Sequence, residues 1–114
     1  MTVMGLKITT DGNVVELDSI SLAVLQESVG GYVQAIDLRD DATMWCNEEG
    51  KLEGLPHNPV GQTLWNGTYG AGTDYIVGNV VFTGGSDEDG ETLPLSEDRA
   101  REIRAVVLEH FIRA

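Results

Sequence analysis

The stretch GGYVQAIDL at positions 30–38 and the stretch MWCNEEGKLEGLPHNPV at positions 44–60 decide the fold of this chain. Their apolar and alternating residues predict two paired strands, Tyr32–Leu38 and Thr43–Asn47, joined by the charged turn Arg39-Asp40-Asp41. An Asn47–Gly50 turn closes this strand pair, and Leu55-Pro56 leads out of it. The sequence therefore places a sheet at the centre of the fold.

A hairpin and a helix are predicted on the N-terminal side of this stretch. Val3–Thr10 alternates apolar and polar residues and meets the turn signal Asp11-Gly12-Asn13 before Val14–Leu17, the usual pattern of a strand hairpin. Asp18–Ser21 offers capping oxygens for a helix, and Gly30-Gly31 supplies its left-handed exit. The residues expected on the apolar face of this helix are Leu22, Leu25 and Val29.

A second helix is predicted to begin at Asn58-Pro59, because Asn is a favoured cap and Pro fits the first helical position. Its two turns carry Val60, Leu64 and Trp65, and they end at Gly67, after which Asn66–Gly72 is expected to be a loop. The next segment, Asp74–Thr83, is apolar on both alternating faces. This pattern predicts a central strand that is covered on each side.

The last part of the chain combines an acidic loop, Gly84–Gly90, with a helix introduced by Pro94-Leu95-Ser96. Glu97 and Asp98 in the first helical turn match the helix dipole. The apolar stripe expected to face the sheet consists of Ala100, Ile103, Val106, Val107, His110 and Phe111. The basic residues expected to point outward or to the rim are Arg99, Arg101, Arg104 and Arg113.

These elements predict an α+β fold: an antiparallel or mixed sheet with two to three helices packed against it. At 114 residues the chain fits a single domain, residues 1–114. Within it we distinguish a core at 3–83, an acidic loop at 84–95 and a C-terminal helix at 96–113.

The formal charge of −12 comes from 19 acidic and seven basic residues. Such a balance argues against direct binding to nucleic acid, which needs clustered Lys and Arg. It fits either a solubilised surface or an acidic face that imitates nucleic acid or engages a basic partner. The C-terminal arginines either neutralise the loop carboxylates of Asp87, Glu88, Asp89 and Glu91 or meet a second copy to form a homodimer.

The sequence predicts a protein of the cytoplasm that has no membrane span. No run approaches the length of a membrane helix, and the first residues lack a basic region before an apolar stretch. A single cysteine, Cys46, excludes an internal disulfide and fits a reducing compartment.

No catalytic group, metal site or cofactor is predicted, and we therefore expect a protein that is not an enzyme. Cys46 and His57 are the only thiol–imidazole pair with a loop nearby, but Cys46 lies in an apolar strand followed by Glu48 and Glu49. These carboxylates would raise the pKa of the thiol, whereas reactive cysteines occupy electropositive sites. Zinc would need several Cys or His residues at short spacing.

The candidate binding residues cluster around two loops. Trp65 and Tyr69 lie beside Gly67 and Gly70 of the predicted glycine-rich loop, where large aromatic rings are available for a partner or a small ligand to stack on. His57 and Asn58 lie beside two prolines in a loop that is able to carry binding. The acidic pair Glu48 and Glu49 in the preceding turn completes the candidate set.

Several of these pieces resemble domain-of-unknown-function family 3846. The resembling residues are Gly30–Ile36, Cys46–Lys51, Gly54-Leu55-Pro56, Asn58-Pro59 and Asp74–Val81, so the resemblance covers residues 3 to 83. It implies an accessory protein of a phage or other mobile element that acts in the host cytoplasm, and it brings no catalytic residues.

Three functions follow from the resemblance and the composition. The first is a non-enzymatic protein that binds a host or phage protein, and the second is a binder of a nucleotide or other small metabolite. The third is an acidic mimic of nucleic acid.

Overall fold

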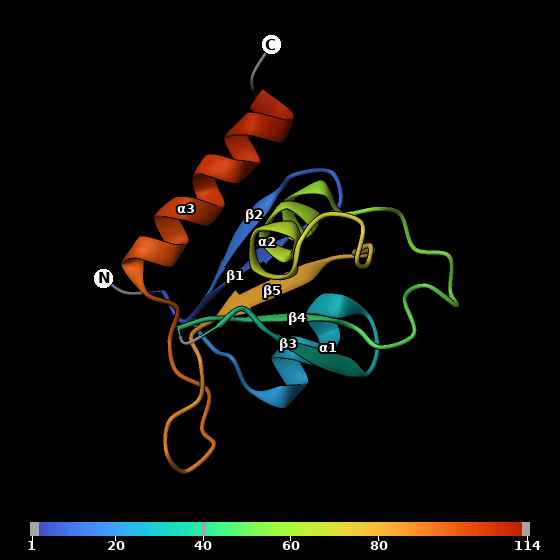
Figure 1. Cartoon of the computed structure of the whole chain (residues 1–114). Coiled ribbons are helices and arrows are strands. Elements are labelled where there is room, and N and C mark those ends of the chain that lie inside the picture. Colours follow the sequence, from blue (N-terminus) through green and yellow to red (C-terminus); the bar gives the residue numbers. More distant parts are fainter. Residues whose placement is uncertain (1–2, 40, 113–114) are drawn as a thin grey trace.

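The computed structural model describes residues 3–39 and 41–112, which form one five-stranded sheet with helices on both faces (Figure 1). The strand order is β2-β1-β5-β4-β3, and every neighbouring pair is antiparallel. The α+β class predicted from the sequence is thereby confirmed. The strands are β1 (Gly5–Ile8), β2 (Val14–Leu17), β3 (Val33–Asp37), β4 (Thr43–Asn47) and β5 (Val80–Thr83), and the helices are α1 (Leu22–Val29), α2 (Pro59–Tyr69) and α3 (Glu97–Val107), which continues as a π-helix η1 (Leu108–Ile112).

The central strand is β5, as its apolar sequence predicted, because it lies between β1 and β4 and all four of its residues are buried. Only Val80–Thr83 forms the strand, whereas the whole of Asp74–Thr83 was expected to. Gly78 interrupts it with a φ of +79°, a conformation that ends an extended run. Before this residue, Val77 forms only an isolated bridge with His57.

The strands β3 and β4 pair in the register Ala35 opposite Trp45. Their connection is the turn between Leu38 and Ala42, as expected, although Asp40 in this turn lies outside the described residues. The Asn47–Gly50 turn does not close the pair. It instead follows the end of β4 and begins the connection to α2, so the prediction that this turn closes the strand pair is wrong.

The two faces of the sheet are covered unequally, because α2 and α3 lie on one face and α1 lies alone on the other (Figure 1). The larger core contains Val60 and Leu64 from α2 and Ile103 and Val107 from α3. The smaller core joins α1 to Val81 of β5. Its helical members are Leu25 and Val29, whereas Leu22 is exposed, contrary to the prediction, because it begins the helix beyond the edge of this small core.

The helix α2 is longer than predicted and runs through Gly67 to Tyr69 before Gly70 ends it. One glycine inside a helix costs only about 1 kcal/mol relative to Ala, which tertiary contacts readily offset. Here the ring of Tyr69 stacks on that of Trp65 with centroids 4.3 Å apart, which supports the last turn. Residues 66–69, predicted to be loop, are therefore helical.

The C-terminal helix places Ile103 and Val107 in the core, as its apolar stripe predicted. The last turn departs from that prediction. Phe111 is 37% exposed and lies against Gly12, where an added Cβ would approach the ring to 2.5 Å, and His110 is exposed and contacts the Thr63 hydroxyl. The expected end of the helix at 113 and the position of Arg113 lie outside the described residues.

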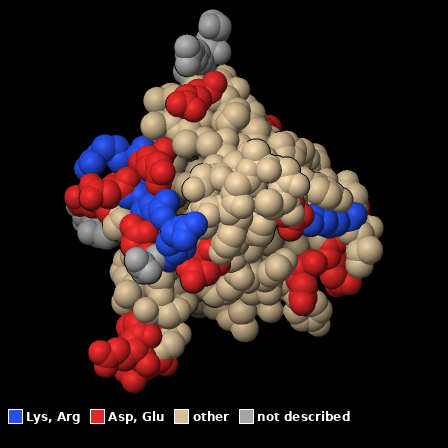
Figure 2. All heavy atoms as spheres, viewed as in Figure 1, with Lys and Arg blue, Asp and Glu red and all other residues tan. Residues whose placement is uncertain are grey.

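The arginines of α3 neutralise carboxylates of the same chain, but not those of the acidic loop, which projects separately at the bottom of the molecule (Figure 2). Arg99 contacts Asp41 and Glu102, and its guanidinium also donates to the Leu38 carbonyl at 2.7 Å. The other two ion pairs are Arg101–Asp98 and Arg104–Glu16.

No helix among residues 3–39 and 41–112 is long and apolar enough to cross a membrane.

Candidate functional site

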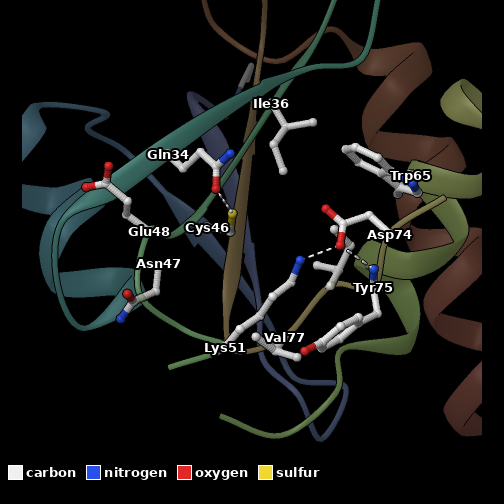
Figure 3. Close-up of a pocket in the computed structure, with 11 residues that line it drawn as sticks. Gln34, Ile36, Cys46, Asn47, Glu48, Lys51, Trp65, Asp74, Tyr75 and Val77 are labelled. Atoms are coloured by element: carbon white, nitrogen blue, oxygen red, sulfur yellow. Dashed lines mark hydrogen bonds and ion pairs between the residues drawn. The ribbon is translucent and has the colours of Figure 1, made fainter. Parts of the chain in front are cut away.

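A pocket of about 180 Å³ opens beside β3, on the sheet face that α2 covers (Figure 3). We call it the Cys46 pocket. Alternation along the strands brings its sheet residues to one face, because Gln34 and Ile36 of β3 lie opposite Cys46 and Met44 of β4. The lining residues are Gln34, Ile36, Cys46, Asn47, Glu48, Lys51, Trp65, Asp74, Tyr75, Ile76 and Val77.

The apolar lining of the Cys46 pocket includes Ile36 and Cys46 from the sheet and Trp65 from α2. The Cys46 side chain is buried, and its Sγ lies 3.9 Å from Oε1 of Gln34, as Figure 3 shows. Burial raises the pKa of the Cys46 thiol to about 11, although nearby Lys51 opposes this effect. The thiol is therefore protonated at neutral pH and contributes a small apolar surface.

The rim carries an ion pair between Lys51 and Asp74 (Figure 3). Lys51 donates a hydrogen bond to the Asp74 carboxylate and thereby holds the pKa of that carboxyl below its usual value. The Lys51 ammonium also lies 4.5 Å from the centre of the Tyr75 ring, a cation–π contact. The Lys51 ammonium and the Asp74 carboxylate thus hold each other in place at the rim.

Two of the six candidate residues, Trp65 and Glu48, line the Cys46 pocket. The Trp65 indole is fixed by its contact with the Tyr69 ring and by a 2.8 Å hydrogen bond from Nε1 to the Thr73 hydroxyl. Tyr69 lies outside the pocket lining, and its hydroxyl donates to the Asp37 carbonyl at the end of β3. The aromatic pair therefore braces α2 against the sheet and gives one wall to the pocket.

Asn58 is fully buried, contrary to its expected place in an accessible loop. Its Oδ1 accepts a hydrogen bond from the Gly61 amide at the start of α2, while Nδ2 donates to the carbonyls of Ile8 and Gly78. These bonds engage both ends of the side-chain amide, so Asn58 is a structural residue and cannot contact a ligand.

His57 and Glu49 are exposed, but neither lines the Cys46 pocket. The Nε2 atom of His57 lies 3.1 Å from Oε1 of Gln62 on α2. The six candidate residues predicted from the sequence therefore do not form one site. Two line the pocket, two make structural contacts, and two lie exposed elsewhere on the surface.

Four lining residues, Gln34, Lys51, Asp74 and Tyr75, are absent from the candidate set predicted from the sequence. The apolar pattern of Asp74–Thr83 predicts a strand, which gives no reason to place Asp74 and Tyr75 at a pocket. Lys51 directly follows the Asn47–Gly50 turn, and this position beside a turn was the one sequence signal that could have marked it as a candidate binding residue.

Within the part of the chain that the structure describes, no cluster of three or more His, Cys, Asp or Glu side chains is arranged to hold a metal ion.

The chain matches the family model described as a domain of unknown function (DUF3846) over residues 1–108, and it belongs to this family. The match extends past residue 83, so the acidic loop and the whole of α3 are part of the family domain, whereas they were expected to be an extension. No curated protein and no solved structure matches the chain.

Proposed function

We propose that this family member is a non-enzymatic binding protein that engages a partner protein through the rim of the Cys46 pocket. The observation that carries this proposal is a small pocket with an exposed Tyr75 on its rim and an exposed Leu52 next to the lining residue Lys51 in the sequence. A volume of about 180 Å³ suits one inserted side chain, since sites for small molecules usually measure about 300–1,000 Å³.

The exposed apolar residues are Leu52, which is 86% exposed and follows Lys51, and Tyr75, which is 55% exposed and lines the rim. Tyrosine is enriched at the centres of protein interfaces, where it combines a large contact area with a polar tip. A partner side chain in the pocket, with Tyr75 and Leu52 packed around it, would bury surface that is otherwise open to water.

The ionisable groups of the pocket support binding over catalysis. The Cys46 thiol is held protonated by burial, and the Lys51 ammonium is paired with Asp74, so neither is activated as a nucleophile. The expectation of a protein that is not an enzyme is part of this proposal.

The biological setting belongs to the same proposal. The family resemblance implies an accessory protein of a phage or mobile element, and the partner is then a host or phage protein in the host cytoplasm. A buried, unpaired thiol supports a reducing compartment.

Two alternative functions have their own supporting observations. The Trp65 wall and the polar rim favour a small metabolite in the Cys46 pocket, which a thermal-shift screen against nucleotides and metabolites tests. The net charge of −12 favours an acidic mimic of nucleic acid, which competition between this protein and DNA for a basic partner tests.

The proposed function is tested by capture from a lysate of the organism that carries the gene. The bait is compared with the double variant Leu52→Ala/Tyr75→Ala and with the control Leu108→Ala, which trims a residue that is 53% exposed on η1. We expect one partner to be retained by the wild type and the control and lost by the double variant. Equal retention by all three baits would overturn the proposal.

A further inference from the structure

The strand β3 is an outer edge of the sheet, and its backbone alternates between groups bonded to β4 and groups that point outward. The Leu38 amide donates to the Ala42 carbonyl at 2.9 Å, and the Tyr32 carbonyl accepts from the Glu48 amide at 2.8 Å. The backbone N–H and C=O groups of the even-numbered residues therefore point toward β4, and those of Val33, Ala35 and Asp37 point away from it.

The open part of this edge is Val33–Ala35. The Asp37 carbonyl already accepts a hydrogen bond from the Tyr69 hydroxyl, which agrees with the outward direction of the odd-numbered groups. Within the described residues, no partner outside the sheet bonds to the backbone groups of Val33 or Ala35. Two residues with both groups free offer four hydrogen bonds to an antiparallel strand.

A hollow lies on each face of the sheet beside β3. The Cys46 pocket lies on the face of Gln34 and Ile36, and a second hollow of about 380 Å³, which we call the Ala35 hollow, lies on the opposite face. Successive side chains of a strand point to opposite faces, so an added strand would direct alternate side chains toward the two hollows. The Ala35 hollow is lined by Ala35, Asp37, Arg39, Thr43, Gly85 and Ser86.

The two edges of the sheet differ in protection. At the β2 edge, Arg104 of α3 bonds to Glu16 and Phe111 packs on Gly12, and Figure 1 shows α3 running beside this strand. The β3 sequence, VQAID, contains neither Lys nor Pro, the residues that commonly block further pairing at an edge. An open edge of this kind is the usual template for strand addition.

We propose that the β3 edge binds an extended, basic segment of the partner protein, paired with Val33–Ala35 and with one apolar side chain in the Cys46 pocket. This inference rests on the proposed function and specifies where and what the protein binds.

The charges around the edge decide the chemistry of the segment. Glu48 at the rim of the Cys46 pocket and Asp37 at the Ala35 hollow have no basic partner among the described residues. Beyond Ser86 the acidic loop adds further carboxylates. Of the basic residues nearby, Lys51 is already paired with Asp74, and the Arg39 guanidinium at the Ala35 hollow donates to the Thr68 carbonyl. A second copy of the chain would bring the same negative edge, whereas Lys or Arg side chains in a partner would complement it.

The test uses a displayed library of short random peptides panned on the full protein. We expect enriched peptides with alternating apolar residues and an excess of Lys and Arg, whose affinity falls as salt rises. Binding should slow hydrogen exchange at the Val33 and Ala35 amides. The Gln34 and Ile36 amides, which face β4, should be protected with or without peptide.

The decisive variant is Ala35→Pro, because proline removes an outward N–H and spares the hydrogen bonds to β4. Its matched control is Ala35→Gly, which keeps the amide. We expect Ala35→Pro to weaken peptide binding by at least about tenfold and Ala35→Gly to retain it. If the proline variant fails to fold, Ala35→Lys serves instead, since a lysine at the edge repels a basic segment and should weaken binding similarly.

The inference is overturned if no basic peptide is enriched, if the proline and lysine variants bind as well as the wild type, or if the Val33 and Ala35 amides exchange unchanged. It is also overturned if the chain alone forms a dimer that Ala35→Pro dissociates, because a second copy would then occupy the edge. If binding of the lysate partner requires Leu52 and Tyr75 but is unaffected by the Ala35 variants, the proposed function stands and only the inference that the β3 edge binds the partner is rejected. Edge-binding peptides without a rim-dependent lysate partner would reject the proposed function alone.

Discussion

Asn58 shows how a single side chain joins three parts of this fold. Its amide caps α2 and bonds to carbonyls at the end of β1 and before β5. The cap was predictable, because Asn-Pro is a local signal for a helix start. The bond to Ile8 was not, because it joins residues 50 positions apart. Sequence patterns that identify a cap carry no information about such distant acceptors.

Replacing Asn58 should therefore destabilise the protein far more than the loss of a surface cap. For Asn58→Ala we expect a loss of about 2–4 kcal/mol, because the cap is removed and two buried carbonyls lose their donor. The free energy of unfolding in urea measures this. Asn58→Asp keeps the capping oxygen and loses both donors, so it should also be destabilising; a change below about 1 kcal/mol in either variant would contradict the account.

Cys46 should make stability depend on alkaline pH. Folding raises the pKa of its thiol from 9.0 to about 11, so above pH 9 the unfolded chain loses the proton before the folded protein does. The contribution of the protonated Cys46 thiol to the free energy of unfolding is complete below pH 9 and is lost between pH 9 and 11. The wild type should therefore lose unfolding free energy between pH 9 and 11 through this thiol, and Cys46→Ala should lack that loss. Parallel declines in the two proteins would contradict the assigned burial.

The same thiol should react slowly with an aromatic disulfide reagent in the native state. At pH 8, a pKa of about 11 leaves a thiolate fraction of about 10⁻³. Labelling should accelerate in denaturant. A native rate equal to that of the unfolded chain would show that Cys46 is open to solvent.

Among the elements, α2 and β5 mark where sequence patterns stop being sufficient. The apolar run correctly placed β5 at the centre of the sheet, but Gly78 shortened the strand through a positive φ that periodicity does not encode. Gly67 was predicted to end α2, yet the contact between Trp65 and Tyr69 carries the helix past it. The Cys46 pocket depends on the second of these segments, since the stretch before the shortened β5 supplies Asp74 and Tyr75, whereas Trp65 already lay in the predicted part of α2.

The helix α3 should depend on Arg99 more than on its other arginines. The Arg99 side chain is 19% exposed and joins α3 to Asp41 and to the Leu38 carbonyl. We expect Arg99→Ala to cost about 1–2 kcal/mol in urea unfolding, because the partly buried Leu38 carbonyl loses a charged donor. Arg101→Ala is the matched control, since its side chain is 75% exposed and, among the described residues, its guanidinium bonds to Asp98 alone. It should change stability by less than about 0.5 kcal/mol, and equal effects would contradict the assigned role of Arg99.

The acidic loop should be dispensable for folding. Its tip bonds to itself, because the Asp87 carboxylate accepts hydrogen bonds from the Asp89 and Glu91 amides. At the base of the loop, Ser86 and Thr92 already form an isolated antiparallel bridge. Replacing residues 87–91 with Asn-Gly, a two-residue hairpin turn, should therefore change the free energy of unfolding by less than about 1 kcal/mol. A loss of several kcal/mol would mean that the loop supports the fold.

At the scale of the molecule, the paired arginines predict a monomer. Arg99, Arg101 and Arg104 each contact a carboxylate of the same chain, so α3 retains little unpaired positive charge for a second copy. Sedimentation at low and high salt should give the same monomeric species. A dimer that dissociates as salt rises would instead support association through the C-terminal helix.

The α+β class and the central strand could be predicted from local sequence patterns, whereas the proposed binding surface could not. Trp65 and Glu48 were recognised as candidates, but Gln34, Lys51 and Tyr75 join them only because three distant segments meet beside β3. A pocket formed by packing of remote segments has no local signature in the sequence.

The affinity of the captured partner for the purified protein tests the central claim most directly. We predict saturable binding to the wild type and a loss of at least about tenfold in Leu52→Ala/Tyr75→Ala, with Leu108→Ala unchanged. Equal dissociation constants for the wild type and the double variant would contradict the claim that this protein acts by binding a partner through the rim of the Cys46 pocket.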